Sequence, residues 1–253
     1  MRLSLAIVLA CLATDPAAAG TFADARAAGV LRVGTPGDYA PFSIRQPGGG
    51  YAGADVTEVE RLGQQLGLRI EWVPTAWGRL AEDAKAGRFD MAVGGISITP
   101  ARRDWADFST VLVDDGKRPV TRCADKDRFV TVAAIDQPGV RVVVNPGGSN
   151  EAFAKANLSH ATITVFPDNA HIAGEIAAGR QDVMVTDGVE VDHDTLVHPE
   201  LCAAAVAEPF TRFQNAFLLQ KDPELKQAVD GFLAGEISSG RWAATLKEAE
   251  RRP

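Results

Sequence analysis

Residues 89–103 read Phe-Asp-Met-Ala-Val-Gly-Gly-Ile-Ser-Ile-Thr-Pro-Ala-Arg-Arg, and the fold is best approached from this stretch. Residues 89–93 are apolar except for Asp90 and have the length of a buried β-strand. Two glycines follow, and then Thr99 and Pro100, which are typical of a helix N-cap and of the first helical position. The stretch therefore predicts a strand, a loop and the start of a helix, with the polar loop at the carboxyl end of the strand.

The same alternation of strand and helix runs through the rest of the chain. Apolar or alternating runs predict strands, and apolar residues at helical spacing predict helices. The predicted strands are 30–34, 68–73, 89–93, 141–144, 162–166, 182–185 and 217–219, and the predicted helices are 57–66, 80–86, 151–157, 170–178, 223–237 and a last one from 240. This order predicts an α/β fold with mostly parallel sheets, which bind ligands at the carboxyl ends of their strands.

The late strand and the helices after it indicate that the chain returns to the domain in which it began. Pro119 and Pro209 lie near the expected crossings. We therefore predict a first lobe of residues 20–120 and 211–253, a second lobe of residues 121–210, and a ligand cleft between them.

The composition is that of a globular protein, with 253 residues of which 46% are hydrophobic and 23% charged. The net charge is −7. We expect no nucleic-acid partner, because a protein that binds phosphate backbones needs a basic face. A small anionic ligand is compatible with this charge, since a few local Arg or Lys side chains can bind it.

The first 19 residues have the pattern of a secretory signal peptide. Arg2 precedes an apolar run over residues 3–13, and Ala17-Ala18-Ala19 forms a small-residue cleavage site. The alternatives are an apolar N-terminal helix of the folded domain and a lipid-modified Cys11. We expect export to the periplasm and no membrane contact after cleavage, because no later stretch approaches the ~18 apolar residues that span a bilayer.

Two cysteines, Cys123 and Cys202, follow the predicted signal peptide. An even pair in an exported chain favours a disulfide, and the alternative is two buried free thiols. The histidines match no metal-binding pattern, and residues 192–194 (Asp-His-Asp) are interpreted as a solvated loop. No nucleophile motif is present either.

Arg102 and a glycine-rich turn are candidates for binding an anion. Arg102 follows the predicted strand 89–93, and a guanidinium group matches a carboxylate with two hydrogen bonds. The alternative is a surface arginine, which is the role that we assign to Arg103. The turn from Asn145 to Glu151 leads into a predicted helix, and it is either an anion site at the helix start or a compact connection.

Asp187 and Glu190 follow the predicted strand 182–185 and are three residues apart. On a helical turn both would face the same side, and two carboxyl groups in one cleft favour a protonated one, as a general acid needs. The alternative is a pair of acids that complements the helix dipole. Trp77 begins a predicted helix and either stacks on a ligand ring or packs in the core.

Several segments together resemble the family 3 periplasmic solute-binding proteins, over nearly the whole mature chain. The motifs are Asp38-Tyr39-x-Pro41-Phe42, Gly53-x-Asp55-Val56, Trp77, Gly87-x-x-Asp90, Ser97-x-Thr99-x-x-Arg102, Gly179-x-x-Asp182 and Asp187. The resemblance implies a two-lobed periplasmic-binding-protein type II fold that closes on an amino acid. It also implies that Arg102 holds the carboxylate of the ligand and that Asp187 holds its amino group.

The match is closer to the cyclohexadienyl dehydratase branch of that family. The segments that carry it are Gly37 to Ser43, Pro74 to Trp77, Gly95 to Ile98, Asp115 to Lys117, Ile135 to Val140, Asn145 to Glu151, Thr186 to Glu190 and His198 to Cys202. This resemblance implies the decarboxylative dehydration of prephenate to phenylpyruvate and of arogenate to phenylalanine. Glu190 matches the general acid of that branch, and the pKa of its carboxyl group must then be raised.

The resemblance also implies roles for the remaining site residues. Arg102 and Lys117 would neutralise the two carboxylates of the substrate, and Trp77 would pack against its ring. The other implied binding residues are Asp38, Ser97, Thr99, Asn145, Ser149 and Asn150. No metal or organic cofactor is implied, because formation of an aromatic ring drives the reaction. The alternative function is a non-catalytic amino-acid-binding protein of an ABC transporter, which would have little use for Glu190 and Lys117.

Overall fold

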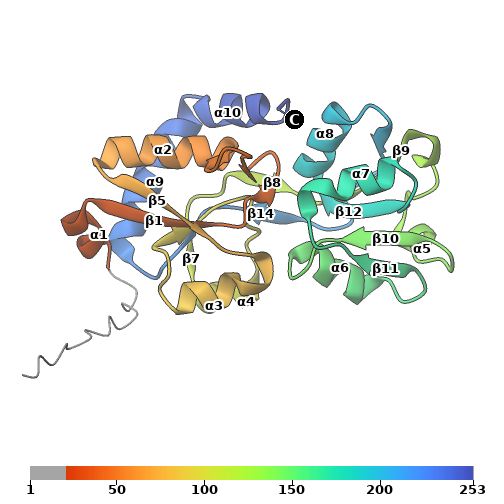
Figure 1. Cartoon of the computed structure of the whole chain (residues 1–253), viewed down its shortest axis with the longest axis horizontal. Coiled ribbons are helices and arrows are strands. Elements are labelled where there is room, and N and C mark those ends of the chain that lie inside the picture. Colours follow the sequence, from red (N-terminus) through yellow and green to blue (C-terminus); the bar gives the residue numbers. More distant parts are fainter. Residues whose placement is uncertain (1–20, 253) are drawn as a thin grey trace, which may run out of the picture.

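Two five-stranded sheets divide the chain into two lobes that lie side by side (Figure 1). The computed structural model describes residues 21–252, so the expected signal peptide at residues 1–19 lies outside the described residues. Helices cover both sheets, as the alternation along the chain predicts. The predicted two-lobed α/β fold is therefore confirmed.

The first sheet has the strand order β5-β1-β6-β15-β7. β1 is parallel to β5 and β6, whereas β15, which returns from the C-terminal part of the chain, is antiparallel to β6 and β7. The strands are β1 (Val30–Thr35), β5 (Arg69–Pro74), β6 (Met91–Ala92), β7 (Asp107–Phe108) and β15 (Leu218–Leu219). The helices of this lobe are α1 (Phe22–Ala28), α2 (Ala54–Leu66), η1 (Trp77–Arg79), α3 (Leu80–Lys85), α4 (Pro100–Arg103), α9 (Pro223–Ser238) and α10 (Arg241–Ala249).

The second sheet has the strand order β11-β10-β12-β9-β13. β10 is parallel to β11 and β12, and β9 is antiparallel to β12 and β13. The strands are β9 (Lys117–Arg122), β10 (Arg141–Val144), β11 (Thr162–Val165), β12 (Val183–Asp187) and β13 (Leu201–Ala203). The helices are η2 (Cys123–Asp125), α5 (Val132–Ile135), α6 (Ser149–Asn157), η3 (Asn169–His171), α7 (Ile172–Ala177) and α8 (Gly188–Val197).

An antiparallel pair of strands, β8 (Val113–Asp115) and β14 (Phe213–Asn215), lies where the chain crosses between the lobes (Figure 1). All of β9 pairs within the second sheet. The boundary predicted after residue 120 thus falls inside β9, because strand pairing and not Pro119 decides where the lobe begins. We propose that β8 and β14 form the hinge and that the second lobe is residues 117–210.

Each lobe has its own apolar core. In the first lobe, Leu31 of β1 packs with Leu62 of α2 and Leu233 of α9. In the second lobe, successive residues of β10 enter two different clusters, one on each face of the sheet. Burial on both faces explains why this strand is a continuous run of valine. A further small sheet of β2 (Asp38–Tyr39), β3 (Ser43–Arg45) and β4 (Tyr51–Ala52) lies at the edge of the first lobe.

The disulfide between Cys123 and Cys202 is present and links η2 to β13. It joins positions 79 residues apart. Closing a loop of this length contributes about 4 kcal/mol in the chain-entropy model. The predicted disulfide is therefore confirmed, and it ties the outer strand β13 to the start of the second lobe.

The interpretation of residues 192–194 as a solvated loop is wrong. α8 continues through them, because no helix-breaking residue follows Gly188 before Pro199. His193 and Asp194 are buried, and Asp192 faces outward with 55% of its side chain exposed. The helix therefore carries two buried titratable groups beyond the pair that the sequence indicates.

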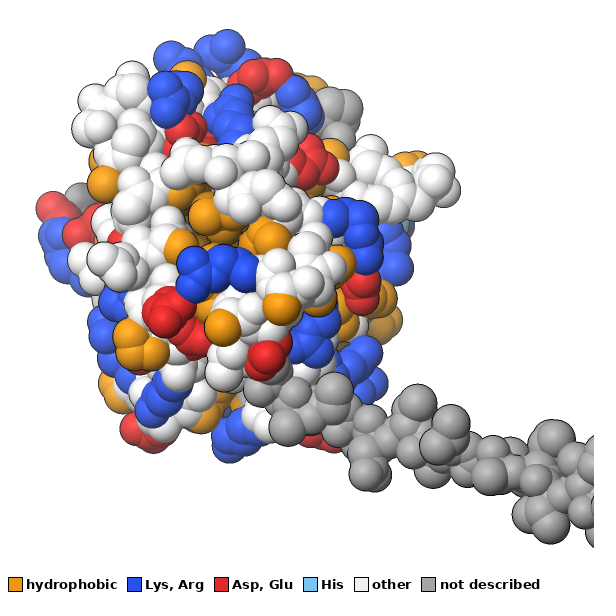
Figure 2. All heavy atoms as spheres, turned by 90° about the vertical axis from the view of Figure 1, so that its left-hand side faces the viewer, with side chains coloured by type: hydrophobic (Ala, Val, Ile, Leu, Met, Phe, Trp, Pro, Cys, Tyr) orange, Lys and Arg blue, Asp and Glu red, His pale blue; other side chains and the backbone are white. Residues whose placement is uncertain are grey.

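The outer face of the first lobe mixes both signs of charge. Figure 2 shows Lys and Arg side chains interspersed with Asp and Glu, with small groups of hydrophobic side chains between them. Among residues 21–252, no helix has both the length and the apolar character needed to cross a membrane.

Candidate active site

Residues from both lobes surround a small cavity of about 10 Å³ at the ends of the strands. Its walls are Tyr39, Trp77, Gly95 and Ser97 from the first lobe and Asn145, Gly148, Ser149, Asn150 and Asp187 from the second. The structure thus brings together predicted binding residues that lie far apart in the sequence. The two lobes are nearly closed on one another at this point, since so little space is left.

Lys117 is a buried cation beside this cavity. It begins β9, opposite Asp187 at the end of β12, and is 4% exposed. Its Nζ donates hydrogen bonds to Asn150 Oδ1 at 2.5 Å, to Asp187 Oδ1 at 2.9 Å and to Ser149 Oγ at 3.2 Å. Burying the charge is tolerable because each of the three N–H groups has a partner.

Arg102 lies in α4, where Thr99 is the predicted N-cap: its hydroxyl accepts a hydrogen bond from the Arg102 N–H at 3.2 Å. The guanidinium group donates to the carbonyl of Ser97 at 2.7 Å. Within residues 21–252, Arg102 forms no salt bridge. Burial lowers the pKa of its guanidinium group, and the negative charge of Asp187 opposes that shift. It therefore keeps donors that a carboxylate of a ligand can use. Arg103 is exposed, as predicted.

Glu190 lies in the first turn of α8 and is 5% exposed. Its carboxyl group accepts one hydrogen bond from the hydroxyl of Thr186 and another from Asn169 Nδ2 at 2.9 Å. Burial raises the pKa of Glu190 well above its usual value, and the charges of Asp194 and Asp187 raise it further. The hydrogen bonds from Thr186 and Asn169 only partly oppose this shift. No cation within residues 21–252 forms a salt bridge with this group, so nothing there offsets the preference of a buried carboxyl group for its protonated form.

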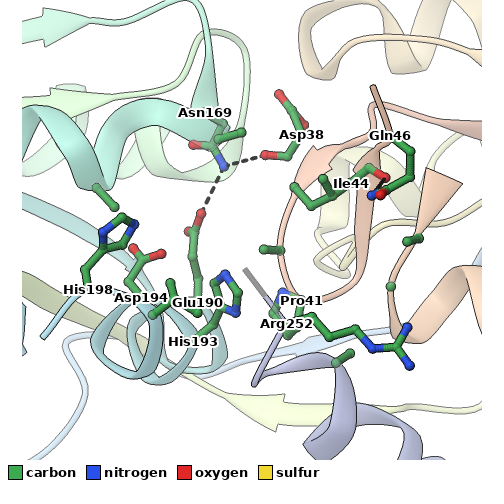
Figure 3. Close-up of a pocket in the computed structure, with 17 residues that line it drawn as sticks. Asp38, Pro41, Ile44, Gln46, Asn169, Glu190, His193, Asp194, His198 and Arg252 are labelled. Carbon is green, nitrogen blue, oxygen red and sulfur yellow. Dashed lines mark hydrogen bonds between the residues drawn. The ribbon is translucent and has the colours of Figure 1, made fainter. Parts of the chain in front are cut away.

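A chain of hydrogen bonds connects Glu190 to both lobes. On one side, Thr186 accepts from Asn150 Nδ2 at 2.9 Å, and Asn150 in turn accepts from Lys117. On the other side, Asn169 Nδ2 also donates to the carbonyl of Asp38 at 3.1 Å (Figure 3). The position of the candidate acid therefore depends on the contact between the lobes.

A larger cavity of about 400 Å³ lies on the other side of Glu190 (Figure 3). Its walls include Asp38 and Pro41 from the first lobe, Asn169, Glu190 and Asp194 from the second, and Arg252 near the C-terminus. Glu190 and Asp38 border this larger cavity, whereas Asp187 and Trp77 border the small one. The single cleft expected from the sequence is thus divided in two in this structure.

Tyr39, Trp77 and Asp38 form part of the wall between the two cavities. Trp77 Nε1 donates to Asp38 Oδ1 at 2.9 Å, and the rings of Tyr39 and Trp77 meet edge to face at 5.6 Å. Burial raises the pKa of Tyr39 well above 10, and the charges of Asp187 and Glu190 add to the shift. Tyr39 therefore keeps its hydroxyl proton.

The turn from Asn145 to Glu151 brings the two lobes into contact. The N–H of Gly147 donates to Glu151 Oε2 at 2.6 Å, so the chain's own carboxylate occupies one of the donors suggested for a ligand anion. A Cβ added to Gly147 would lie 2.5 Å from the backbone of Gly78 in the first lobe. The turn therefore allows close approach of the lobes, in addition to contributing Asn145 and Ser149 to the cavity.

Tyr39, Asn169 and Asp194 are site residues that the sequence analysis did not predict. Asn169 follows β11, so the rule that ligands bind at strand ends could have identified it. Tyr39 lies inside a recognised motif and was assigned no role of its own. Asp194 was missed because its segment was interpreted as a loop. Within residues 21–252, no group of three or more His, Cys, Asp or Glu side chains is arranged to hold a metal ion.

Comparison with known proteins relates these features to a family. Residues 31–248 match the model for bacterial extracellular solute-binding proteins, family 3. The chain is 48% identical over 212 residues to the cyclohexadienyl dehydratase of Pseudomonas aeruginosa, which covers 84% of this chain and 79% of that protein. It is 26% identical over 213 residues to the L-cystine-binding protein of Escherichia coli, covering 81% of this chain and 77% of that protein.

Solved structures show the same relationships. An ancestral cyclohexadienyl dehydratase is 41% identical, covers 90% of this chain and 95% of its own, and superimposes with a TM-score of 0.56. An ancestral amino-acid-binding protein, described as a precursor of cyclohexadienyl dehydratase, is 31% identical with a TM-score of 0.81, covering 91% of this chain and 99% of its own. The matched length and the two-lobed fold with a site between the lobes agree: the chain belongs to the bacterial extracellular solute-binding proteins of family 3.

Proposed function

We propose that this protein is a cyclohexadienyl dehydratase, a carbon–oxygen lyase that converts prephenate to phenylpyruvate and arogenate to phenylalanine. The observation that carries the proposal is Glu190, a buried carboxyl group with neutral hydrogen-bond partners and a strongly raised pKa. The relative at 48% identity supports the same activity. A protein that only binds amino acids has little use for a protonated acid at this position.

In the proposed reaction Glu190 donates its proton to the hydroxyl group at C4 of the substrate ring. The C–O bond breaks and water leaves, while the ring carboxylate leaves as carbon dioxide. The electron pair of the broken C–C bond enters the ring, which becomes aromatic. General acid catalysis of this kind contributes about 10²–10⁴-fold to a rate.

Two cations are available for the two carboxylates of the substrate. Arg102 would bind one of them with its free donors, as in the family pattern. Lys117 would bind the other by exchanging a neutral partner such as Ser149 for the carboxylate. Asp187 would then remain next to the lysine and accept hydrogen bonds from the amino group of arogenate. Trp77 would pack against the ring, while Asp38, Ser97, Thr99, Asn145 and Asn150 would complete the polar contacts.

The lobes must open before a substrate can enter. A cavity of about 10 Å³ has no room for a ring with two carboxylates. Rotation about β8 and β14 would join the two cavities into one cleft with Glu190 between them. Closure would then exclude water and strengthen the interactions with the two cations.

The test is turnover by the purified mature protein. We would follow phenylpyruvate formed from prephenate and phenylalanine formed from arogenate, for the wild type, Glu190→Gln and the exposed control Asp192→Asn. The proposal expects turnover by the wild type and the control and a loss of orders of magnitude in Glu190→Gln. Turnover that survives in Glu190→Gln would assign the acid elsewhere, with Asp187 the next candidate. Tight binding of an amino acid without turnover of either substrate would instead identify a transport receptor.

We also propose that residues 1–19 direct the chain to the periplasm and are then removed. The extracellular character of the family supports this location. N-terminal sequencing of protein recovered from a periplasmic extract should give Gly20 as the first residue. Recovery of the full-length chain from the cytoplasm alone would contradict it.

A further inference from the structure

Asp194 is a buried acid that the proposed reaction does not use. It lies one helical turn after Glu190 on α8, and both side chains line the larger cavity (Figure 3). Asp194 is 9% exposed, and within the described part of the chain its carboxyl group has no hydrogen-bond or salt-bridge partner. Its oxygens border the larger cavity, where water is the partner open to them.

The proposed reaction leaves Glu190 without a proton, and Asp194 could supply a new one. Glu190 loses its proton to the departing water and must regain one before the next turnover. Its oxygens are held by Thr186 and Asn169, and it is nearly inaccessible to bulk water. The larger cavity is the space that Glu190 borders, and its volume of about 400 Å³ is ample for several water molecules of ~30 Å³ each.

We propose that Asp194 returns the proton to Glu190 through water in the larger cavity. This inference rests on the proposed function. The carboxyl group of Asp194 gives its proton to a cavity water, and that water passes one of its own protons to the Glu190 carboxylate. Solvent then protonates Asp194 again. The net change per turnover is one proton moved from solvent to Glu190, and no other bond is made or broken.

The titration of Asp194 is suited to this role. Burial raises the pKa of Asp194 to about 7, so the group both holds and releases a proton near neutral pH. His193 is the main competitor, but its Nδ1 is bonded to the carbonyl of Glu250, and burial lowers its pKa. The charged and titratable groups around Glu190 and Asp194 are Asp38, Tyr39, Lys117, Asp187, His193, His198, Glu250 and Arg252.

The experiment compares three variants with the wild type. Asp194→Asn removes the proposed proton donor and keeps the shape of the side chain. Asp192→Asn removes an acid from the exposed side of the same helix and is the matched control. His193→Gln tests the competing route, and thermal unfolding of each variant checks that it is folded.

The decisive readout is the time course of product at saturating substrate, measured by rapid mixing near pH 6. Wild type and Asp192→Asn should show no burst. Asp194→Asn should release one equivalent of product per site at the wild-type rate, because Glu190 starts protonated, and then slow by about tenfold or more. Small acids such as imidazolium or acetic acid should accelerate this slow phase, and Asp194→Glu should restore continuous turnover.

Each other result overturns the relay in a recognisable way. A wild-type steady-state rate in Asp194→Asn would show that the proton reaches Glu190 by another route, and a burst confined to His193→Gln would identify that route. An equal loss in the first and later turnovers of folded Asp194→Asn would show that Asp194 only shapes the site. No turnover by the wild type refutes the proposed function itself, and the relay with it.

Discussion

Two buried carboxylic acids flank β12, and their pKa values are shifted in opposite directions. At the amino end, Asp182 accepts hydrogen bonds from Arg141 at 2.6 and 3.0 Å and from Arg122 at 3.1 Å. Burial opposes ionisation there, yet the arginine hydrogen bonds prevail and lower the pKa of Asp182 to about 2. At the carboxyl end, Glu190 has an amide and a hydroxyl for partners, and its pKa rises well above the usual value.

The difference shows that cationic partners can outweigh burial: the arginines do so at Asp182, whereas burial prevails at Glu190. Asp182 is paired with cations and joins β12 to β10 and β9, so its charge stabilises the fold. Glu190 is deprived of a cation although Lys117 is nearby, because Asp187 already holds that lysine. The start of the strand therefore serves stability, and its end carries the proposed proton donor.

The largest expected effect is on activity at the carboxyl end. Glu190→Gln should lower kcat by about 10²–10⁴-fold, because an amide N–H is too weakly acidic to transfer its proton to the substrate. The melting temperature should stay equal or rise, since the amide retains the hydrogen bonds and carries no charge to bury. Steady-state kinetics measures kcat, and calorimetry measures the melting temperature. A Glu190→Gln variant that loses stability but keeps its activity would contradict the proposed difference from Asp182.

The reverse pattern is expected at the amino end. Asp182→Asn should reduce the free energy of unfolding by about 2 kcal/mol and leave kcat within a factor of two or so of the wild type. The loss is smaller than for a fully buried pair, because the side chain of Arg141 is 43% exposed. Denaturant titration measures it. A larger loss of stability in Glu190→Gln than in Asp182→Asn would contradict this assignment.

Lobe closure gives the next effect. Gly147→Ala should lower kcat/KM by about tenfold, since the added methyl group would meet the backbone of Gly78 at 2.5 Å. Gly179→Ala is the matched control, with a φ of +72° against +75° and nothing within 4 Å of the added carbon. Kinetics and small-angle X-ray scattering would compare them. Equal losses would attribute the effect to backbone strain alone.

The smallest effects concern the pH dependence of stability, where the two acids have opposite signs. The lowered pKa of Asp182 gives stability that is present above its unfolded value of about 4 and is lost as the pH falls through about 2. The raised pKa of Glu190 gives stability that is present below its unfolded value and is lost as the pH rises. Glu190→Gln should therefore gain stability relative to the wild type above pH 5, and Asp182→Asn should lose its deficit below pH 3. Chemical denaturation across this range measures both, and parallel curves would refute the contrast.

Much of the fold and part of the site could be predicted from local patterns. The order of strands and helices gave the two-lobed α/β fold, Thr99 and Pro100 gave the start of α4, and the even cysteine pair gave the disulfide. These features depend on residues close in sequence or on simple counting, so a linear pattern contains them. The local pattern also singled out Asp187 and Glu190 as a pair of acids after a strand, and the resemblance to the dehydratase branch assigned the acid role to Glu190.

The tertiary structure decided which side chains meet and what charge they carry. The contacts of Asn169 with Glu190 and of Lys117 with Asp187 join different elements, and their distances depend on sheet twist and on how far the lobes close. The burial of Asp194 and the division of the cleft into two cavities have the same origin. Solvent exclusion and neighbouring charges set a pKa, and neither exists until the two lobes have folded and come together.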